Sequence, residues 1–172
     1  ISYHHDLPLN IVDYCEHIPY NPISQQFIGD YEMPNWCRND VVVSGDEKDV
    51  SRFINLMTSD GKDFEEGFSF NKIVPQPDNI FLDNLGEDER KECEKKNIPN
   101  WYDWNIENWD TKWDASSVSV GCIEVDYVEF SFNTAWGPPM NVIKKLKKMF
   151  PKLNVHGAYV GEGYEFAGTF DD

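Results

Sequence analysis

The sequence predicts an α+β domain in which an antiparallel sheet carries two main helices on one face. Three observations predict this class. Short β-branched or alternating runs end at turn residues, two other segments repeat apolar residues at helical spacing, and aromatic residues make up 15% of the chain. Because aromatic side chains bury large areas, this content is sufficient for a real core. The 172 residues correspond to one domain with room for an appendage.

The first strand and helix are read from residues 39–61. "NDVVVSG", residues 39–45, is a β-branched run closed by glycine and predicts a strand. Ser44 and Glu47 then stand at the spacing of a capping box, which predicts a helix start. The apolar stripe of this helix consists of Val50, Phe53, Ile54 and Met57. A strand followed by an amphipathic helix is therefore expected.

The middle of the chain is expected to contain an acidic, tryptophan-rich insertion over about residues 78–115. Before it, Phe68–Val74 is predicted to be a strand that two prolines end. Residues 86–97 are so charged that a surface helix is expected. The tryptophans that follow predict an irregular loop pinned to the core, with a carbohydrate-stacking or base-stacking platform as the alternative. They are Trp101, Trp104, Trp109 and Trp113.

The last third of the chain predicts a hairpin, a helix and a second hairpin. Residues 117–124 and 127–134 alternate and form the first pair of strands. The helix is expected to begin at Pro138-Pro139, and the second hairpin to turn at Gly161-Glu162-Gly163. This order of elements is the ferredoxin-like topology, in which Trp136 is expected to plug the core at the edge of the sheet.

Residues 1–32 form a predicted N-terminal arm, separate from a domain over residues 33–172. The arm has five acidic residues and neither Lys nor Arg. It holds three histidines and a cysteine whose types suit zinc but whose spacing matches no familiar ligand pattern, so incidental histidines are the favoured interpretation. These residues are His4, His5, Cys15 and His17.

Four stretches resemble the YubB-like family of plasmid and phage proteins. They are "MPNWCRN" (33–39), "ENWDTKWDA" (107–115), "FNTAWGPPMNVIKKL" (132–146) and "FPKLNVHGAYVGEGYEFAG" (150–168). The resemblance implies a ferredoxin-like domain from Met33 to about Phe170 and an accessory protein of a mobile element, located in the bacterial cytoplasm. It supplies no catalytic residues. Similar proteins tend to have glycine where this chain has Asp110, in the turn before "TKWDA".

The net charge and the absence of known motifs disfavour several classes of function. The net charge of −16 disfavours ordinary binding to nucleic acid. Phosphate-binding, zinc-protease and serine-hydrolase motifs are absent from the sequence. His156 could form a nucleophile–base pair with Cys37 or Cys122 only if the fold brought them together. No enzyme activity, cofactor, metal or membrane partner is therefore expected, and the oligomeric state is left open.

The function that we expect from the sequence is binding to a host protein. Residues 78–129 contain 14 acidic and 5 basic residues, a local net charge of −9, so mimicry of nucleic acid against a defence enzyme is one form of this function. The partner-binding candidates are Glu87, Asp88, Glu89, Glu92, Glu94, Asp103, Glu107, Asp110, Trp136 and Glu162.

Two other functions remain open. The first is a module that binds single-stranded nucleic acid or nucleotides through the Lys144–Lys148 helix and exposed tryptophans. The second is a hydrolase or metal-dependent enzyme hidden in the insertion.

Overall fold

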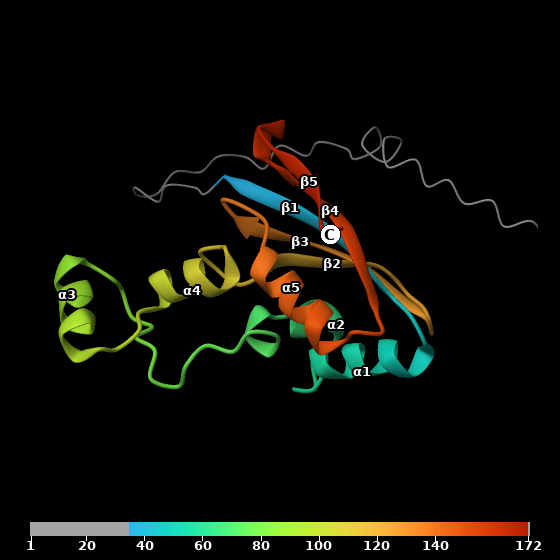
Figure 1. Ribbon diagram of the computed structural model, residues 1–172, viewed down its shortest axis with the longest axis horizontal. Helices are drawn as coiled ribbons and strands as arrows, with labels where there is room; N and C mark the ends of the chain where they lie inside the picture. Colours follow the sequence, from blue (N-terminus) through green and yellow to red (C-terminus); the bar gives the residue numbers. More distant parts are fainter. Residues whose placement is uncertain (1–34, 172) are drawn as a thin grey trace, which may run out of the picture. The chain divides into compact units, whose positions relative to one another are not determined.

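The sheet has five antiparallel strands in the order β2-β3-β1-β4-β5. Figure 1 shows it in a computed structural model that describes residues 35–171, all within the compact unit Met33–Asp172. The predicted arm, with His4, His5, Cys15 and His17, lies outside the described residues. The strands are β1 (Trp36–Ser44), β2 (Ser116–Ile123), β3 (Tyr127–Ala135), β4 (Asn154–Gly161) and β5 (Ala167–Thr169).

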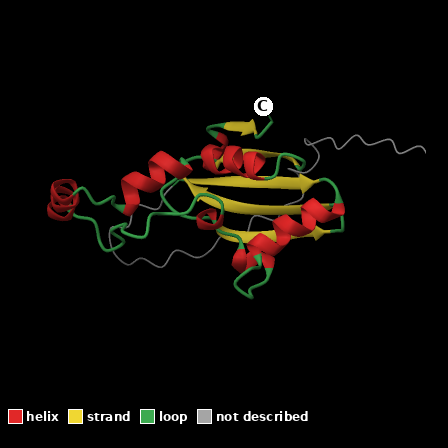
Figure 2. Ribbon diagram, turned by 60° about the horizontal axis from the view of Figure 1, so that its bottom comes forward, coloured by secondary structure: helices red, strands yellow, loops and turns green. Residues whose placement is uncertain are grey.

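The helices lie on one face of the sheet or beyond its end. Helices α1 (Glu47–Met57), α2 (Phe64–Gly67) and α5 (Met140–Met149) cover one face, as Figure 2 shows. Helices α3 (Glu87–Lys96) and α4 (Trp101–Trp109) belong to the segment between α2 and β2. Two short 3-10 helices, η2 (Phe70–Lys72) and η3 (Glu162–Tyr164), complete the described elements. None of the helices within residues 35–171 has the length and hydrophobicity that crossing a membrane requires.

The topology confirms the predicted fold. Strand β3 lies between β1 and β2, so β1, α1 and β2 form the split βαβ unit of a ferredoxin-like domain. Strand β4 pairs with the other edge of β1, and β5 extends the sheet beyond it. Both predicted hairpins are present as β2–β3 and β4–β5.

The core lies between the sheet and the helices and is rich in phenylalanine. In β1 the side chains at alternate positions are buried, which places Val41 and Val43 against the helices. Phe53 of α1 contacts the ring of Phe130 in β3, with 6.3 Å between the ring centroids. The predicted apolar stripe of α1 is thus the face that builds the core.

Two local predictions were wrong. Ser44 does not cap α1, because it is the last residue of β1 and pairs with Tyr127; Asp46 is the N-cap instead. Phe68–Val74 is not a strand but contains η2. Phe68 and Phe70 are buried by packing against aromatic rings of β3 and not by a strand ladder, so a run of apolar residues misled the prediction.

Two predictions about tryptophan also need correction. The tryptophan-rich segment is not irregular, because residues 101–109 form helix α4. Asn100 caps this helix, and its side chain accepts a hydrogen bond from the backbone N–H of Asp103 at 2.9 Å. Trp136 does not plug the core, since 43% of its surface is exposed.

The expected start of the last helix also needs correction. The two prolines precede α5 instead of forming its first turn, and Pro139 is the N-cap.

Candidate functional site

Four segments that are distant in the sequence meet at one end of the sheet. At this end β1 and β2 begin and β3 and β4 finish, since Trp36 pairs with Ala135, and Cys37 pairs with Gly161. The connections that gather here are the start of β1, the α4–β2 connection, the β3–α5 corner and η3. They contain the sequences "NW" (35–36), "TKWD" (111–114), "TAW" (134–136) and "GEG" (161–163).

The β3–α5 corner holds Trp136 in an unusual backbone conformation. Its φ of 73° lies in the left-handed region, which is unfavourable for a bulky residue. Its backbone N–H donates to the carbonyl of Asn35 at 2.8 Å, and the hydroxyl of Thr134 donates to the carbonyl of Gly137 at 2.7 Å. These bonds fix the corner, and the indole points away from the core. A strained position that presents a large exposed side chain is a reason to look for function there.

Lys112 lies among the faces of three aromatic rings. Its Nζ is 4.5 Å from the ring centroid of Trp113, 5.2 Å from that of Trp136 and 5.8 Å from that of Tyr102. All three distances fall within the range of a cation–π interaction. The rings of Tyr102 and Trp136 also meet edge to face, with centroids 6.1 Å apart.

Two further side chains extend this group. The ring of Trp36 lies 6.2 Å from that of Trp113, and the guanidinium of Arg90 lies 4.7 Å from the ring centroid of Tyr102. Together, the six residues Trp36, Arg90, Tyr102, Lys112, Trp113 and Trp136 form what we call the aromatic–cation cluster.

Two predicted carboxylates border the aromatic–cation cluster. Glu162 accepts a hydrogen bond from the backbone N–H of Trp36 at 3.1 Å. Asp103 forms an ion pair with Arg90 at 2.9 Å. Burial opposes the ionisation of Asp103, but the hydrogen bonds from Asn100 and Arg90 outweigh it, so its pKa is lowered. The structure therefore brings Asp103, Trp136 and Glu162 to one end of the domain.

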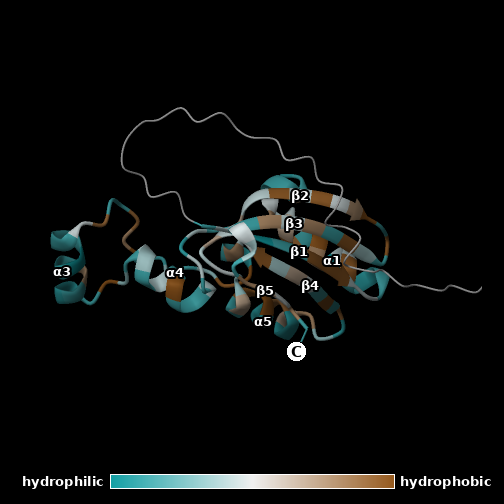
Figure 3. Ribbon diagram, turned by 90° about the horizontal axis from the view of Figure 1, so that it is seen from above, coloured by the Kyte–Doolittle hydropathy of each residue, from teal (hydrophilic) through white to brown (hydrophobic). Residues whose placement is uncertain are grey.

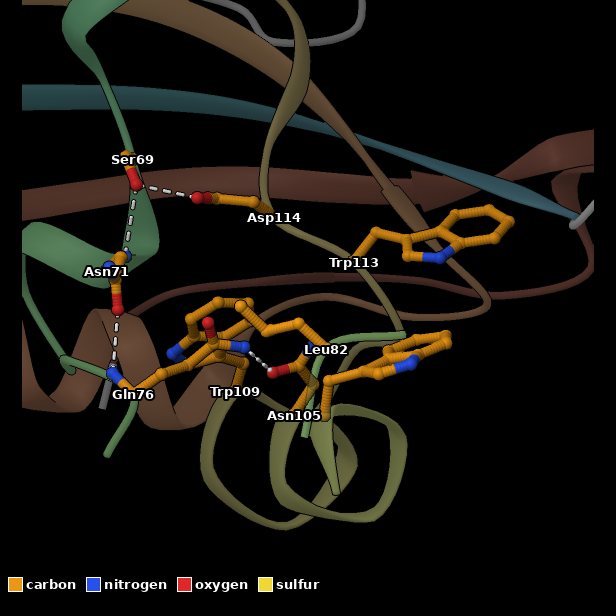
Figure 4. Close-up of a pocket in the computed structure, with 9 residues that line it drawn as sticks. Ser69, Asn71, Gln76, Leu82, Asn105, Trp109, Trp113 and Asp114 are labelled. Atoms are coloured by element: carbon orange, nitrogen blue, oxygen red, sulfur yellow. Dashed lines mark hydrogen bonds between the residues drawn. The ribbon is translucent and has the colours of Figure 1, made fainter. Parts of the chain in front are cut away.

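A hollow of about 370 Å³ adjoins the cluster. Trp113 lines it and thus belongs to both features. Figure 4 shows Asn71 and Gln76 on the left of this hollow, Asn105 at its centre and the indole of Trp113 on the right. The side chain of Asn71 accepts a hydrogen bond from the backbone N–H of Gln76. Gln76 donates to Asn105 at 2.6 Å, and Asn105 donates to the carbonyl of Lys112 at 2.9 Å. This chain of hydrogen bonds fixes the backbone that carries Lys112.

The predicted carboxylates of α3 are exposed but are largely balanced by neighbouring cations. The helix carries five acidic and four basic side chains, a net charge of −1, and Figure 3 shows it as strongly hydrophilic. Glu92 pairs with Lys96 at 2.6 Å, and Glu87 lies 3.9 Å from Lys91. Glu89 caps the start of the helix, because its carboxylate accepts a hydrogen bond from the backbone N–H of Gly86. Asp88 and Glu94 are the other predicted acids of α3.

Glu107 and Asp110 connect α4 to the start of α5. The carboxylate of Asp110 accepts from the backbone N–H of Asn141 at 2.8 Å, and the carbonyl of Glu107 accepts from the Asn141 side chain at 3.1 Å. Asp110 itself has a φ of 64°, a conformation that glycine adopts without strain. A second hollow, of about 380 Å³ between α3 and α4, is lined by Glu94, Asp103 and Glu107 among others.

The fold keeps His156 apart from both Cys37 and Cys122. His156 pairs with Val42, five positions along β1 from Cys37, which corresponds to about 16 Å. Cys122 is on β2, which is separated from β4 by the two strands β3 and β1, so the distance across the sheet is about 14 Å. Burial raises the pKa of the Cys37 thiol to about 11, so this side chain stays protonated. In the part of the chain that the structure describes, no group of three His, Cys, Asp or Glu side chains is arranged to hold a metal ion.

Sequence reasoning missed most of the aromatic–cation cluster. Trp36, Arg90, Tyr102, Lys112 and Trp113 were not among the candidate site residues. One signal was available for Lys112: it is the only cation between Asp103 and Asp114, a stretch with four carboxylates and three tryptophans. Its meeting with Trp136 depends on the sheet register and was not visible in the sequence.

Comparison with known proteins supports the fold. Residues 108–171 match a family described as "Ferredoxin-like domain in Api92-like protein". The match covers somewhat more than a third of the chain and includes β2 through β5 with α5. This part of the chain is therefore similar to a ferredoxin-like domain. Neither the curated proteins nor the solved structures contain a match.

Proposed function

We propose that this domain is a non-catalytic binding module that contacts a host protein through the aromatic–cation cluster. The exposure of two indoles carries the proposal: Trp136 is 43% exposed and Trp113 is 36% exposed. Tryptophan, tyrosine and arginine are the residues that most often contribute large binding energies at protein interfaces. The phage or plasmid setting implied by the YubB-like resemblance makes a host protein the natural partner.

In the finer form of the proposal, the partner is a nucleic-acid-processing defence enzyme whose basic groove is blocked by carboxylates. The chain's net charge of −16 supports this form. The charge balance within α3 means that this helix alone is a poor imitation of a phosphate backbone. A phosphate-like array would therefore need, in addition to the carboxylates of α3, others such as Glu107 and Glu162, which form no ion pair with the lysines and arginines within residues 35–171.

The test is affinity capture from host lysate with nuclease treatment, using the full chain and its Trp136→Gly variant. Glycine removes the indole and accepts the φ of 73°, so the free energy of unfolding of this variant should stay within about 0.5 kcal/mol of the wild-type value. We expect the wild type to retain a stoichiometric protein and the variant to lose it.

Tyr164→Gly is a matched control. Tyr164 also has a positive φ, of 60°, and is 80% exposed, but it lies outside the aromatic–cation cluster. It should capture the partner as the wild type does. Equal capture by Trp136→Gly would contradict the proposal.

A second variant tests mimicry separately. Glu87, Asp88, Glu89, Glu92 and Glu94 are all replaced by the corresponding amides. If mimicry contributes, this variant should capture less of the partner than the wild type does. The binding between the wild type and the partner should also weaken as salt increases. If capture is unchanged, the domain is a protein-binding module in which α3 does not mimic nucleic acid.

Binding to single-stranded nucleic acid is a second candidate, favoured by the exposed lysines of α5. Lys144, Lys145 and Lys148 face solvent on a helix that begins four residues after Trp136. The wild type should then bind single-stranded DNA or RNA with an affinity that falls steeply as salt increases. Replacement of all three lysines by glutamine should abolish this binding. No binding by the wild type at low salt would end this candidate.

A further inference from the structure

We propose that Tyr102, Trp113 and Trp136 form a binding site for an organic cation, which Lys112 of the same chain fills in the free protein. The partner's lysine or arginine side chain would displace Lys112; this last clause rests on the proposed function. Nothing in the comparisons assigns such a site.

The geometry is that of an aromatic cage. The three rings come from different parts of the fold: Tyr102 from α4, Trp113 from the α4–β2 connection and Trp136 from the β3–α5 corner. The Nζ of Lys112 lies within 5.8 Å of all three ring centroids. Aromatic rings attract cations through the negative potential of their faces, and cages of this kind recognise alkylated ammonium groups.

Lys112 is held in a way that allows its displacement. Among the described residues, its ammonium contacts the faces of the three rings and forms no ion pair with a carboxylate. Its backbone carbonyl is fixed separately by Asn105. The flexible side chain can therefore move into water, where the ammonium is rehydrated, without any disturbance of the backbone.

The surroundings favour a cation over an anion. Glu162 borders the cage at Trp36, whereas Asp103 only neutralises Arg90, the cation beside Tyr102. The two rings that remain most exposed, Trp113 and Trp136, are also the two nearest to the ammonium of Lys112. A basic segment of a partner would thus meet indole faces in the centre and the carboxylate of Glu162 at the border. This arrangement fits a partner that binds nucleic acid, because such proteins present lysine and arginine on their surfaces.

The experiment uses the full chain with the substitution Lys112→Ala and tetramethylammonium chloride as the probe. Tryptophan fluorescence and the NMR signals of the indole N–H groups are followed during the titration, with sodium chloride at equal ionic strength as the reference. We expect saturable binding that is about tenfold tighter for Lys112→Ala than for the wild type. Tenfold corresponds to about 1.4 kcal/mol, the size of the cation–π contacts that Lys112 must give up.

Two controls make the result specific. Lys144→Ala removes an exposed lysine of α5 outside the cage and should behave as the wild type. The double variant with Lys112→Ala and Trp136→Gly lacks one wall of the cage and should lose the saturable signal. If Lys112→Ala does not fold, the wild type is titrated, and the same signal should appear at about tenfold higher concentration and disappear in Trp136→Gly.

A folded Lys112→Ala protein that shows no saturable response would overturn the proposal, and Lys112 would then only pin α4 to the β3–α5 corner. Failure of the proposed function gives a different pattern. In that case tetramethylammonium would bind Lys112→Ala as expected, but the wild type would capture no protein from lysate.

Discussion

The side-chain amide of Asn39 donates a hydrogen bond of 2.9 Å to the hydroxyl of Thr134, and neither residue has any exposed surface. Asn39 belongs to β1 and Thr134 to β3, 95 residues later. The same amide donates to the carbonyls of Cys37 and Phe132. A buried polar pair of this kind is tolerated only when its hydrogen bonds are made, so it couples the end of β3 to the start of β1.

Replacement of Asn39 by Ala should destabilise the domain by about 2–4 kcal/mol, because it opens a cavity and leaves the Thr134 hydroxyl without one of its partners. Thr134→Val should cost about 1–3 kcal/mol, because it leaves the buried amide of Asn39 without one of its acceptors. The double variant should cost less than the two separate losses together, by about 1 kcal/mol. Urea unfolding of the four proteins measures this coupling, and strict additivity would show that the two side chains do not interact.

Cys37 should make the stability of the domain decrease at alkaline pH. Burial raises the pKa of its thiol to about 11 from 9.0, so the folded protein keeps a proton that the unfolded chain releases. The stabilisation is complete below pH 9 and is lost as the pH rises through 11, at no more than about 1.4 kcal/mol per pH unit.

The measurement is the difference in the free energy of unfolding between wild type and Cys37→Ala at several pH values. This difference removes the contributions of other groups, such as Tyr127, whose pKa is raised to about 12 by its hydrogen bond to Cys122. A difference that does not change between pH 8 and 10.5 would contradict the assignment.

Asp110 should affect the stability of the domain in two opposing ways. Its hydrogen bonds to Asn141 stabilise the fold, whereas its positive φ costs free energy, and three substitutions can separate these contributions. Asp110→Ala keeps the strain of the positive φ and loses the bonds to Asn141, so we expect a loss of about 2 kcal/mol. Asp110→Gly loses the same bonds but relieves the strain, so about 1 kcal/mol is expected. Asp110→Asn keeps an acceptor and tolerates the conformation, and it should stay closest to the wild type. Thermal unfolding ranks the four proteins, and an Ala variant as stable as the Gly variant would contradict this account.

The tryptophans of α4 should differ sharply in their contribution to stability. Trp109 is 2% exposed and donates its indole N–H to the carbonyl of Val74 at 2.9 Å, so Trp109→Ala should cost about 3–5 kcal/mol. Trp101 is only partly buried, and Trp101→Ala should cost less than about 1.5 kcal/mol. Urea unfolding followed by circular dichroism compares the two, and similar losses would show that burial does not decide their roles.

The sequence by itself determined the elements whose pattern is periodic. The stripe of α1, the alternation of β2 and β3 and the β4–β5 hairpin follow from which side chains must leave water, and the order of these elements selects the ferredoxin-like topology. The pattern failed where burial comes from aromatic packing. Phe68 and Phe70 are spaced like the buried residues of a strand, although their backbone pairs with none of the strands within residues 35–171.

Helix α4 could have been predicted from its cap. Asn100 is followed three residues later by Asp103, which is a helix-start signal, but four closely spaced tryptophans drew the interpretation toward a loop.

Only the tertiary structure decided the candidate site. The register that pairs Trp36 with Ala135 places the start of β1 beside the β3–α5 corner, and the course of α4 brings Tyr102 and Lys112 to the same place. No local pattern encodes such a meeting, because cation–π contacts join residues by position in space and not by spacing in the chain. The sequence thus determined which residues build the sheet and its helices, whereas the fold determined which exposed side chains share one surface.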